Sequence, residues 1–65
     1  MKVELTIYDK EVNPLELMVV AEYLDARGTQ SADIYKGNNC IWVATGQINE
    51  YFIFRGGKLV DIQID

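Results

Sequence analysis

The sequence contains no histidine, one cysteine (Cys40) and one serine (Ser31). Without histidine, the chain lacks the usual general base that activates a serine or cysteine nucleophile. A single cysteine cannot form a disulfide within the chain, and it cannot make a Cys/His zinc site by itself. Cys40 also begins the apolar run 40–44, where burial raises a thiol's pKa and makes it unreactive. We therefore predict a non-enzymatic protein with no metal or cofactor, in a reducing compartment.

Long hydrophobic runs are also lacking. The longest apolar stretches are residues 17–21 and 40–44, far shorter than the roughly 20 residues that span a membrane. The first residues alternate between polar and apolar side chains, which is not typical of a signal peptide. We expect no membrane association and a cytoplasmic location.

Basic residues are outnumbered, because ten acidic residues face six lysines and arginines, for a net charge of −4. Residues 1–33 hold seven of the acidic residues and three of the basic ones, whereas the charges of residues 34–65 cancel. An acidic surface repels phosphate backbones, so we do not expect nucleic acid as a partner. The same charge favours a basic protein partner.

What is present is a pattern of one helix and five strands in 65 residues, the length of one small domain (residues 1–65). Alternating side chains predict a strand over residues 2–8. Asn13, Pro14 and Glu16 have the residue types that begin a helix, and Gly28 has the type that ends one. Apolar runs between turn residues predict strands over residues 31–36, 40–45, 50–55 and 58–64. We predict the α+β class, with one helix packed on an antiparallel meander in the order β-α-β-β-β-β.

The apolar residues exceed what one face of a sheet requires. Residues 14–27 carry two apolar stripes on nearly opposite sides, and a helix lying on a sheet in water needs only one. One stripe contains Leu17, Val20, Ala21 and Leu24; the other contains Leu15, Val19, Tyr23 and Ala26. A two-residue turn at Gly56-Gly57 pairs Tyr51 with Ile62 and Phe52 with Asp61, which leaves apolar groups on both faces of the hairpin.

We therefore predict an apolar interface with another protein, and we expect a homodimer because small domains gain stability by association. The predicted interface uses Leu15, Val19, Tyr23 and Ala26 on the helix, or Trp42, Phe52, Phe54 and Leu59 on the sheet. The acidic residues of the helix, Glu16, Glu22 and Asp25, would steer a basic partner. Such a domain would act as an inhibitor, adaptor or accessory factor, and small acidic proteins of this kind include virus-encoded inhibitors of host enzymes.

A different class of function is a protein that sequesters a nucleotide or small molecule. The hairpin tip Arg55-Gly56-Gly57-Lys58 carries two cations and exposed amides that would form a lip for an anion. Two further patterns are weaker. Glu50 and Asp61 would approach each other across the hairpin, where solvated polar positions at the sheet rim explain them without acid–base chemistry. The aromatic residues Trp42, Tyr51, Phe52 and Phe54 would stack nucleobases only with a basic groove, which this acidic chain does not supply.

Overall fold

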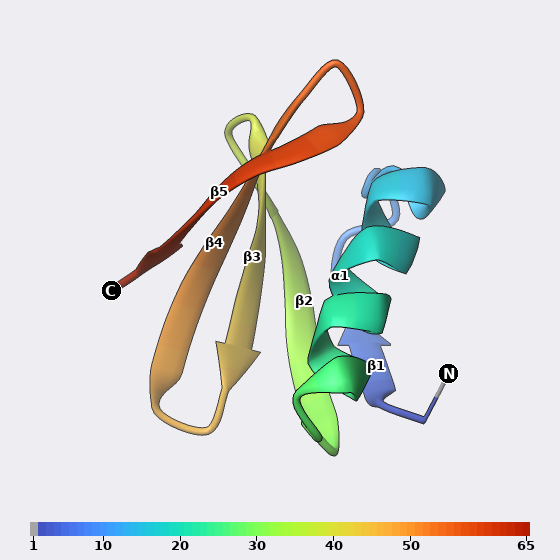
Figure 1. Ribbon diagram of the computed structural model, residues 1–65, viewed down its shortest axis with the longest axis vertical. Helices are drawn as coiled ribbons and strands as arrows, with labels where there is room; N and C mark the ends of the chain where they lie inside the picture. The colour runs from blue at the N-terminus through green and yellow to red at the C-terminus, as the bar shows by residue number, and fades with distance from the viewer. Residues whose placement is uncertain (1) are drawn as a thin grey trace.

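The protein is described by a computed structural model that covers residues 2–65. Within this range the chain forms one helix and a five-stranded sheet (Figure 1). The elements are β1 (Glu4–Ile7), α1 (Pro14–Ala26), β2 (Ser31–Gly37), β3 (Cys40–Thr45), β4 (Ile48–Arg55) and β5 (Lys58–Ile64). The predicted α+β class and element order are confirmed.

The strands lie in the sheet in their order along the chain, β1-β2-β3-β4-β5. Strands β2 to β5 form the predicted antiparallel meander, but β1 pairs with β2 in parallel, with Leu5 beside Ala32 and Ile7 beside Ile34. Parallel neighbours need a crossover connection, and α1 supplies it. The helix runs along the β1–β2 end of the sheet, while β5 twists across β4 (Figure 1).

Helix α1 begins and ends with the predicted caps. The side-chain oxygen of Asn13 accepts hydrogen bonds from the backbone N–H groups of Leu15 (2.9 Å) and Glu16 (3.3 Å). At the other end Gly28 has φ +82°, and the N–H of Thr29 donates to the carbonyl of Leu24 at 2.9 Å, which completes a Schellman cap. With 13 residues, α1 is short, and no helix within residues 2–65 is long and apolar enough to cross a membrane.

Replacing Asn13 with alanine should remove both capping hydrogen bonds of α1. Loss of an N-cap side chain costs about 0.5–2 kcal/mol of stability, and a urea unfolding curve followed by circular dichroism measures it. Asn13→Asp keeps an acceptor at the cap and is the matched control. An Asn13→Ala protein as stable as the wild type would show that the cap contributes nothing to the fold.

The core lies between α1 and the sheet face that it covers. Val20, Ala21 and Leu24 are buried, with Leu17 packed partly against them, so the first of the two predicted stripes faces inward. The sheet contributes Ala32, Ile34, Ile41, Val43, Phe52 and Phe54. These strand residues alternate with residues on the opposite face of the sheet, which no helix covers within residues 2–65.

The hairpin of β4 and β5 differs from the predicted pairing by one residue. Gly56 and Gly57 have φ values of +59° and +80°, as the predicted primed turn requires, and Arg55 pairs with Lys58. Phe54 pairs with Leu59, but the next pair away from the turn is Ile53 with Asp61. A β-bulge at this point leaves Val60 unpaired and shifts the register by one residue. A one-residue shift moves every later side chain of β5 to the other face. Ile62 therefore lies beside Phe52 against the core, and the prediction that Asp61 faces Phe52 is wrong.

Candidate functional site

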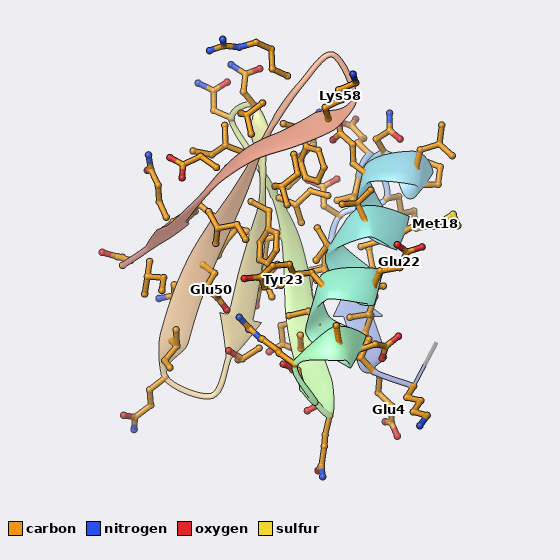
Figure 2. The ribbon with its side chains drawn as sticks, in the orientation of Figure 1. Glu4, Met18, Glu22, Tyr23, Glu50 and Lys58 are labelled. Atoms are coloured by element: carbon orange, nitrogen blue, oxygen red, sulfur yellow. The ribbon has the colours of Figure 1, made fainter. Side chains whose placement is uncertain are left out.

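The second stripe of α1 forms an exposed apolar surface. This helix outer face consists of Leu15, Met18, Val19, Tyr23 and Ala26. Leu15 is 73% exposed and Met18 is 58% exposed. Figure 2 shows Met18 and Glu22 pointing away from the sheet, whereas Tyr23 extends toward the sheet and Glu50. Sequence reasoning omitted Met18 because its helical position falls between the two predicted stripes.

Tyr23 connects the helix outer face to the core. Its ring meets the ring of Phe52 edge-on, with 5.5 Å between centroids. The guanidinium carbon of Arg27 lies 5.7 Å from the Tyr23 ring centroid. Because Tyr23 has these two contacts, replacing it would disturb the fold as well as any interface.

Arg27 and Glu50 form an ion pair beside Tyr23. Arg27 Nη1 donates to Glu50 Oε2 at 2.9 Å, and Nη2 donates to the other carboxylate oxygen. Glu50 is buried, with 3% of its surface exposed. The hydrogen bond from Arg27 lowers the pKa of Glu50 and outweighs the effect of burial, which raises it. Glu50 therefore stays charged, and its predicted position in a solvated sheet rim is wrong.

The register of the β4–β5 hairpin places Glu50 and Asp61 on opposite faces of the sheet. Glu50 pairs with Ile64 across the hairpin and faces the helix, whereas Asp61 pairs with Ile53 on the uncovered face. The two carboxylates considered for acid–base chemistry therefore do not share a site, because the bulge at Val60 changes the register between them.

Among the predicted steering residues, Asp25 is held in the fold. Its carboxylate oxygen accepts hydrogen bonds from the backbone N–H groups of Lys2 (3.0 Å) and Val3 (2.7 Å). It therefore ties the segment before β1 to the end of α1. Glu16 and Glu22 remain beside the helix outer face, with Glu22 exposed and Glu16 half-buried.

The predicted interface on the sheet is divided between its two faces. Phe52 and Phe54 lie in the core and Leu59 packs partly against it, so these three residues are not available as an open surface. Trp42 lies on the uncovered face, because β3 pairs Ile41 with Phe52 and Trp42 with Tyr51. The antiparallel register thus separates Trp42 from the two phenylalanines.

Four aromatic rings cross the uncovered face of the sheet. This aromatic row consists of Tyr8, Tyr35, Trp42 and Tyr51. Successive ring centroids are 4.9, 4.6 and 6.2 Å apart, and the planes of Tyr8 and Tyr35 differ by 8°. The first two separations match the roughly 4.8 Å between neighbouring strands, so the rings stand on the sheet and stack across it. The indole N–H of Trp42 donates to Asn49 Oδ1 at 3.0 Å and orients the indole ring.

Partial burial raises the pKa values of two tyrosines in the row. For Tyr35, the charge of Asp33 adds to the effect of burial. For Tyr51, the charge of Asp65 adds to it, and the Tyr51 hydroxyl also donates to Asp65 at 3.4 Å. Tyr35 and Tyr51 therefore remain neutral hydrogen-bonding groups at physiological pH.

Sequence reasoning missed Tyr8 and Tyr35 as members of the row. The two-residue turn after Gly37, together with Gly46-Gln47, aligns Tyr35, Trp42 and Tyr51 across three strands. The alignment of these three residues could have been predicted from the sequence, but only with the lengths of both turns known. Tyr8 had no such signal, because the parallel register of β1 depends on how α1 packs.

A cleft of about 530 Å³ lies between the start of α1, the β2–β3 turn and the hairpin tip. Its lining includes the carboxylates of Glu11 and Glu16 and the ammonium of Lys36. Lys36 Nζ lies 3.6 Å from Glu11 Oε2. Gly56 borders the cleft, but Arg55 and Lys58 are not among its lining residues. The predicted anion lip is therefore exposed hairpin tip rather than the wall of this cleft, and anion binding stays a prediction.

Comparisons with protein-family models, curated proteins and solved structures found no match to this chain. Within residues 2–65, no group of three or more His, Cys, Asp or Glu side chains is placed to hold a metal ion. Burial raises the pKa of the Cys40 thiol. The surfaces with the clearest geometry are thus the helix outer face and the aromatic row.

Proposed function

We propose that this chain is a non-enzymatic protein-binding domain whose interface is the helix outer face. The observation that carries the proposal is the exposure of Leu15, Met18 and Val19 to solvent, at 73%, 58% and 36%. Grouped apolar side chains on the surface of a small domain usually mark an interaction site. A domain that binds without chemistry of its own acts as an inhibitor, adaptor or accessory factor.

The charges around this face favour a partner with a basic rim. Glu22 lies among the apolar residues, and Glu16 lies in the first turn. Helix α1 carries no lysine or arginine, and Arg27 at its end is bound to Glu50. Two copies of this face would bring Glu22 toward its counterpart with no free cation of α1 to offset the repulsion. We therefore favour a different protein over the homodimer expected from composition.

Three features support the non-enzymatic part of the proposal. The sequence lacks histidine, and the thiol pKa of Cys40 is raised by burial. The one buried carboxylate among residues 2–65, that of Glu50, already has both oxygens bonded to Arg27. Glu50 is thus held in an ion pair, and Cys40 has no histidine to act as its base.

Replacing Leu15 and Val19 together with serine should weaken partner binding without unfolding the domain. Each large aliphatic side chain buried at an interface contributes about 1.5–3 kcal/mol, so capture of the partner should fall at least about tenfold. The measurement is quantitative capture of proteins from a native lysate by the immobilised wild type and variant. Ile48→Ser is the matched control, because Ile48 is 52% exposed near the β3–β4 turn.

We expect the wild type and Ile48→Ser to capture the same basic protein, and Leu15→Ser/Val19→Ser to capture much less of it. Equal capture by all three proteins would contradict the proposal. Light scattering decides the competing homodimer. A mass near twice 7.4 kDa that falls to the monomer value in the double variant would assign the helix outer face to self-association instead.

A further inference from the structure

The aromatic row is a second uncovered surface, on the side of the sheet opposite α1. We propose that it binds an extended, arginine-rich segment of a protein, laid along the rings from Tyr8 toward Tyr51. This site is independent of the helix outer face. Together the two surfaces would allow the domain to join two partners.

The free end of the row suits a planar cation. Tyr8 follows β1, which is an edge strand of the sheet, and its backbone N–H donates to the Ile34 carbonyl at 2.9 Å. One face of its ring stacks on Tyr35, and Tyr8 is 60% exposed. A guanidinium stacks on an exposed tyrosine face with its plane parallel to the ring.

Carboxylates border the same row. Asp33 lies two residues before Tyr35 on β2 and therefore on the same face of the sheet. Asp65 accepts a hydrogen bond from the Tyr51 hydroxyl. Asp61 accepts the side-chain amide of Gln63 at 3.4 Å, and Gln63 pairs with Tyr51.

The cations among the strand residues lie away from the row. Lys36 pairs with Ile41, which is buried on the helix side of the sheet, and Lys36 is near Glu11. Arg55 is four residues beyond Tyr51, roughly 13 Å along β4 at about 3.3 Å per residue, and Lys58 lies beside it at the hairpin tip. Among the strand residues, the charges beside the rings are therefore those of Asp33 and Asp61, whereas Lys10 follows Tyr8 by two residues outside the sheet.

Arginine matches this combination better than lysine does. Its guanidinium is planar, stacks on aromatic rings and donates paired hydrogen bonds to a carboxylate, whereas an ammonium is a compact, strongly hydrated charge. Its methylene stem can cover the edges of the rings. The same charges oppose a single-stranded nucleic acid, whose bases would stack on the rings but whose phosphates would meet Asp33 and Asp61.

Trp42 provides the test, because it is the single tryptophan of the chain and lies inside the row. The purified chain is titrated with an octa-arginine peptide at low salt, and tryptophan emission is recorded. Parallel titrations use an octa-lysine peptide and an oligothymidine strand. We expect a saturable change with octa-arginine, at least about fivefold tighter binding than with octa-lysine, and no saturable change with oligothymidine.

Variants then localise the binding. Tyr8→Ser and Asp33→Asn should each weaken octa-arginine binding about two- to fivefold, the effect of one exposed cation–π contact or ion pair. Tyr8→Phe keeps the ring and should bind as the wild type does. Glu22→Gln changes the net charge by the same amount as Asp33→Asn but lies on α1, so it controls for general charge attraction.

Several outcomes would overturn the assignment. Equal affinity for arginine and lysine peptides, or equal loss in Asp33→Asn and Glu22→Gln, would show non-specific charge attraction. Saturable binding of oligothymidine would assign the row to single-stranded nucleic acid. Because the Leu15→Ser/Val19→Ser variant should bind octa-arginine normally, failure of this proposal is distinguishable from failure of the helix interface.

Discussion

Replacing Phe52 with alanine is expected to leave the domain largely unfolded or without fixed packing. Phe52 is fully buried in the core, pairs with Ile41 on β3 and Ile62 on β5, and contacts the ring of Tyr23. Removing a buried phenylalanine side chain costs about 3–5 kcal/mol. At about 0.05–0.15 kcal/mol per residue, a chain of 65 residues has a total stability of about 3–10 kcal/mol, so this loss is a large part of it.

Urea unfolding followed by circular dichroism and by Trp42 emission measures the loss. Tyr51→Ala is the matched control, because Tyr51 is the neighbouring aromatic residue but lies half-buried on the uncovered face. It should cost about 1–2 kcal/mol, the middle of the range for single substitutions. If Phe52→Ala cost no more than Tyr51→Ala, the assignment of Phe52 to the core would be wrong.

Replacing Arg27 with methionine is expected to produce the second largest effect. The variant keeps an aliphatic side chain over Tyr23 but leaves Glu50 buried without its cation. Removing one partner of a fully buried ion pair costs about 3–5 kcal/mol. The Arg27 side chain is 36% exposed whereas that of Glu50 is 4% exposed, so water offsets part of the loss, and we expect about 2–3 kcal/mol at pH 7.

The loss should depend on pH in a defined direction. In the wild type the pKa of Glu50 lies below its ordinary value of 4.5, mainly because of the hydrogen bond from Arg27. The stabilisation from this group is therefore present above pH 4.5 and is lost as pH falls through the folded-state pKa. In Arg27→Met, burial without a cation raises the pKa of Glu50 instead, so the folded variant takes up a proton as pH falls.

The difference in stability between Arg27→Met and the wild type should therefore shrink between pH 7 and pH 4. Urea unfolding at both values measures it. Adding Glu50→Gln to the Arg27→Met variant removes the buried charge, and the double variant should regain part of the stability at pH 7 and lose the pH dependence. A difference that stays constant from pH 7 to pH 4 would contradict a charged, ion-paired Glu50.

Local signals in the sequence predicted the elements well. The capping types of Asn13 and Gly28 located α1 to within a residue, and two glycines located the β4–β5 turn. Such signals work because they depend on backbone conformations and hydrogen bonds that neighbouring residues make. The exposure of Leu15 and Val19 also agrees with the observation that α1 has more apolar residues than one buried stripe requires.

Register and pairing could not be predicted in the same way. The bulge at Val60 has no clear signature in the residues around it. The bulge turns Asp61 away from the core and brings Ile62 into contact with the core. The stabilisation from this contact exists only once Phe52 and α1 are in place. The ion pair of Arg27 and Glu50 joins residues 23 positions apart, and neither residue alone signals the other.

By itself, the sequence determined the six elements, their order and the acidic character. These properties follow from composition and from interactions between near neighbours in the chain. The tertiary structure alone decided which stripe of α1 is buried, that β1 joins the sheet in parallel, and that four aromatic residues form one row. Each of these depends on contacts between segments that are distant in the sequence. The outcome is set by the relative energies of whole alternative packings, which cannot be assigned to any one stretch of residues.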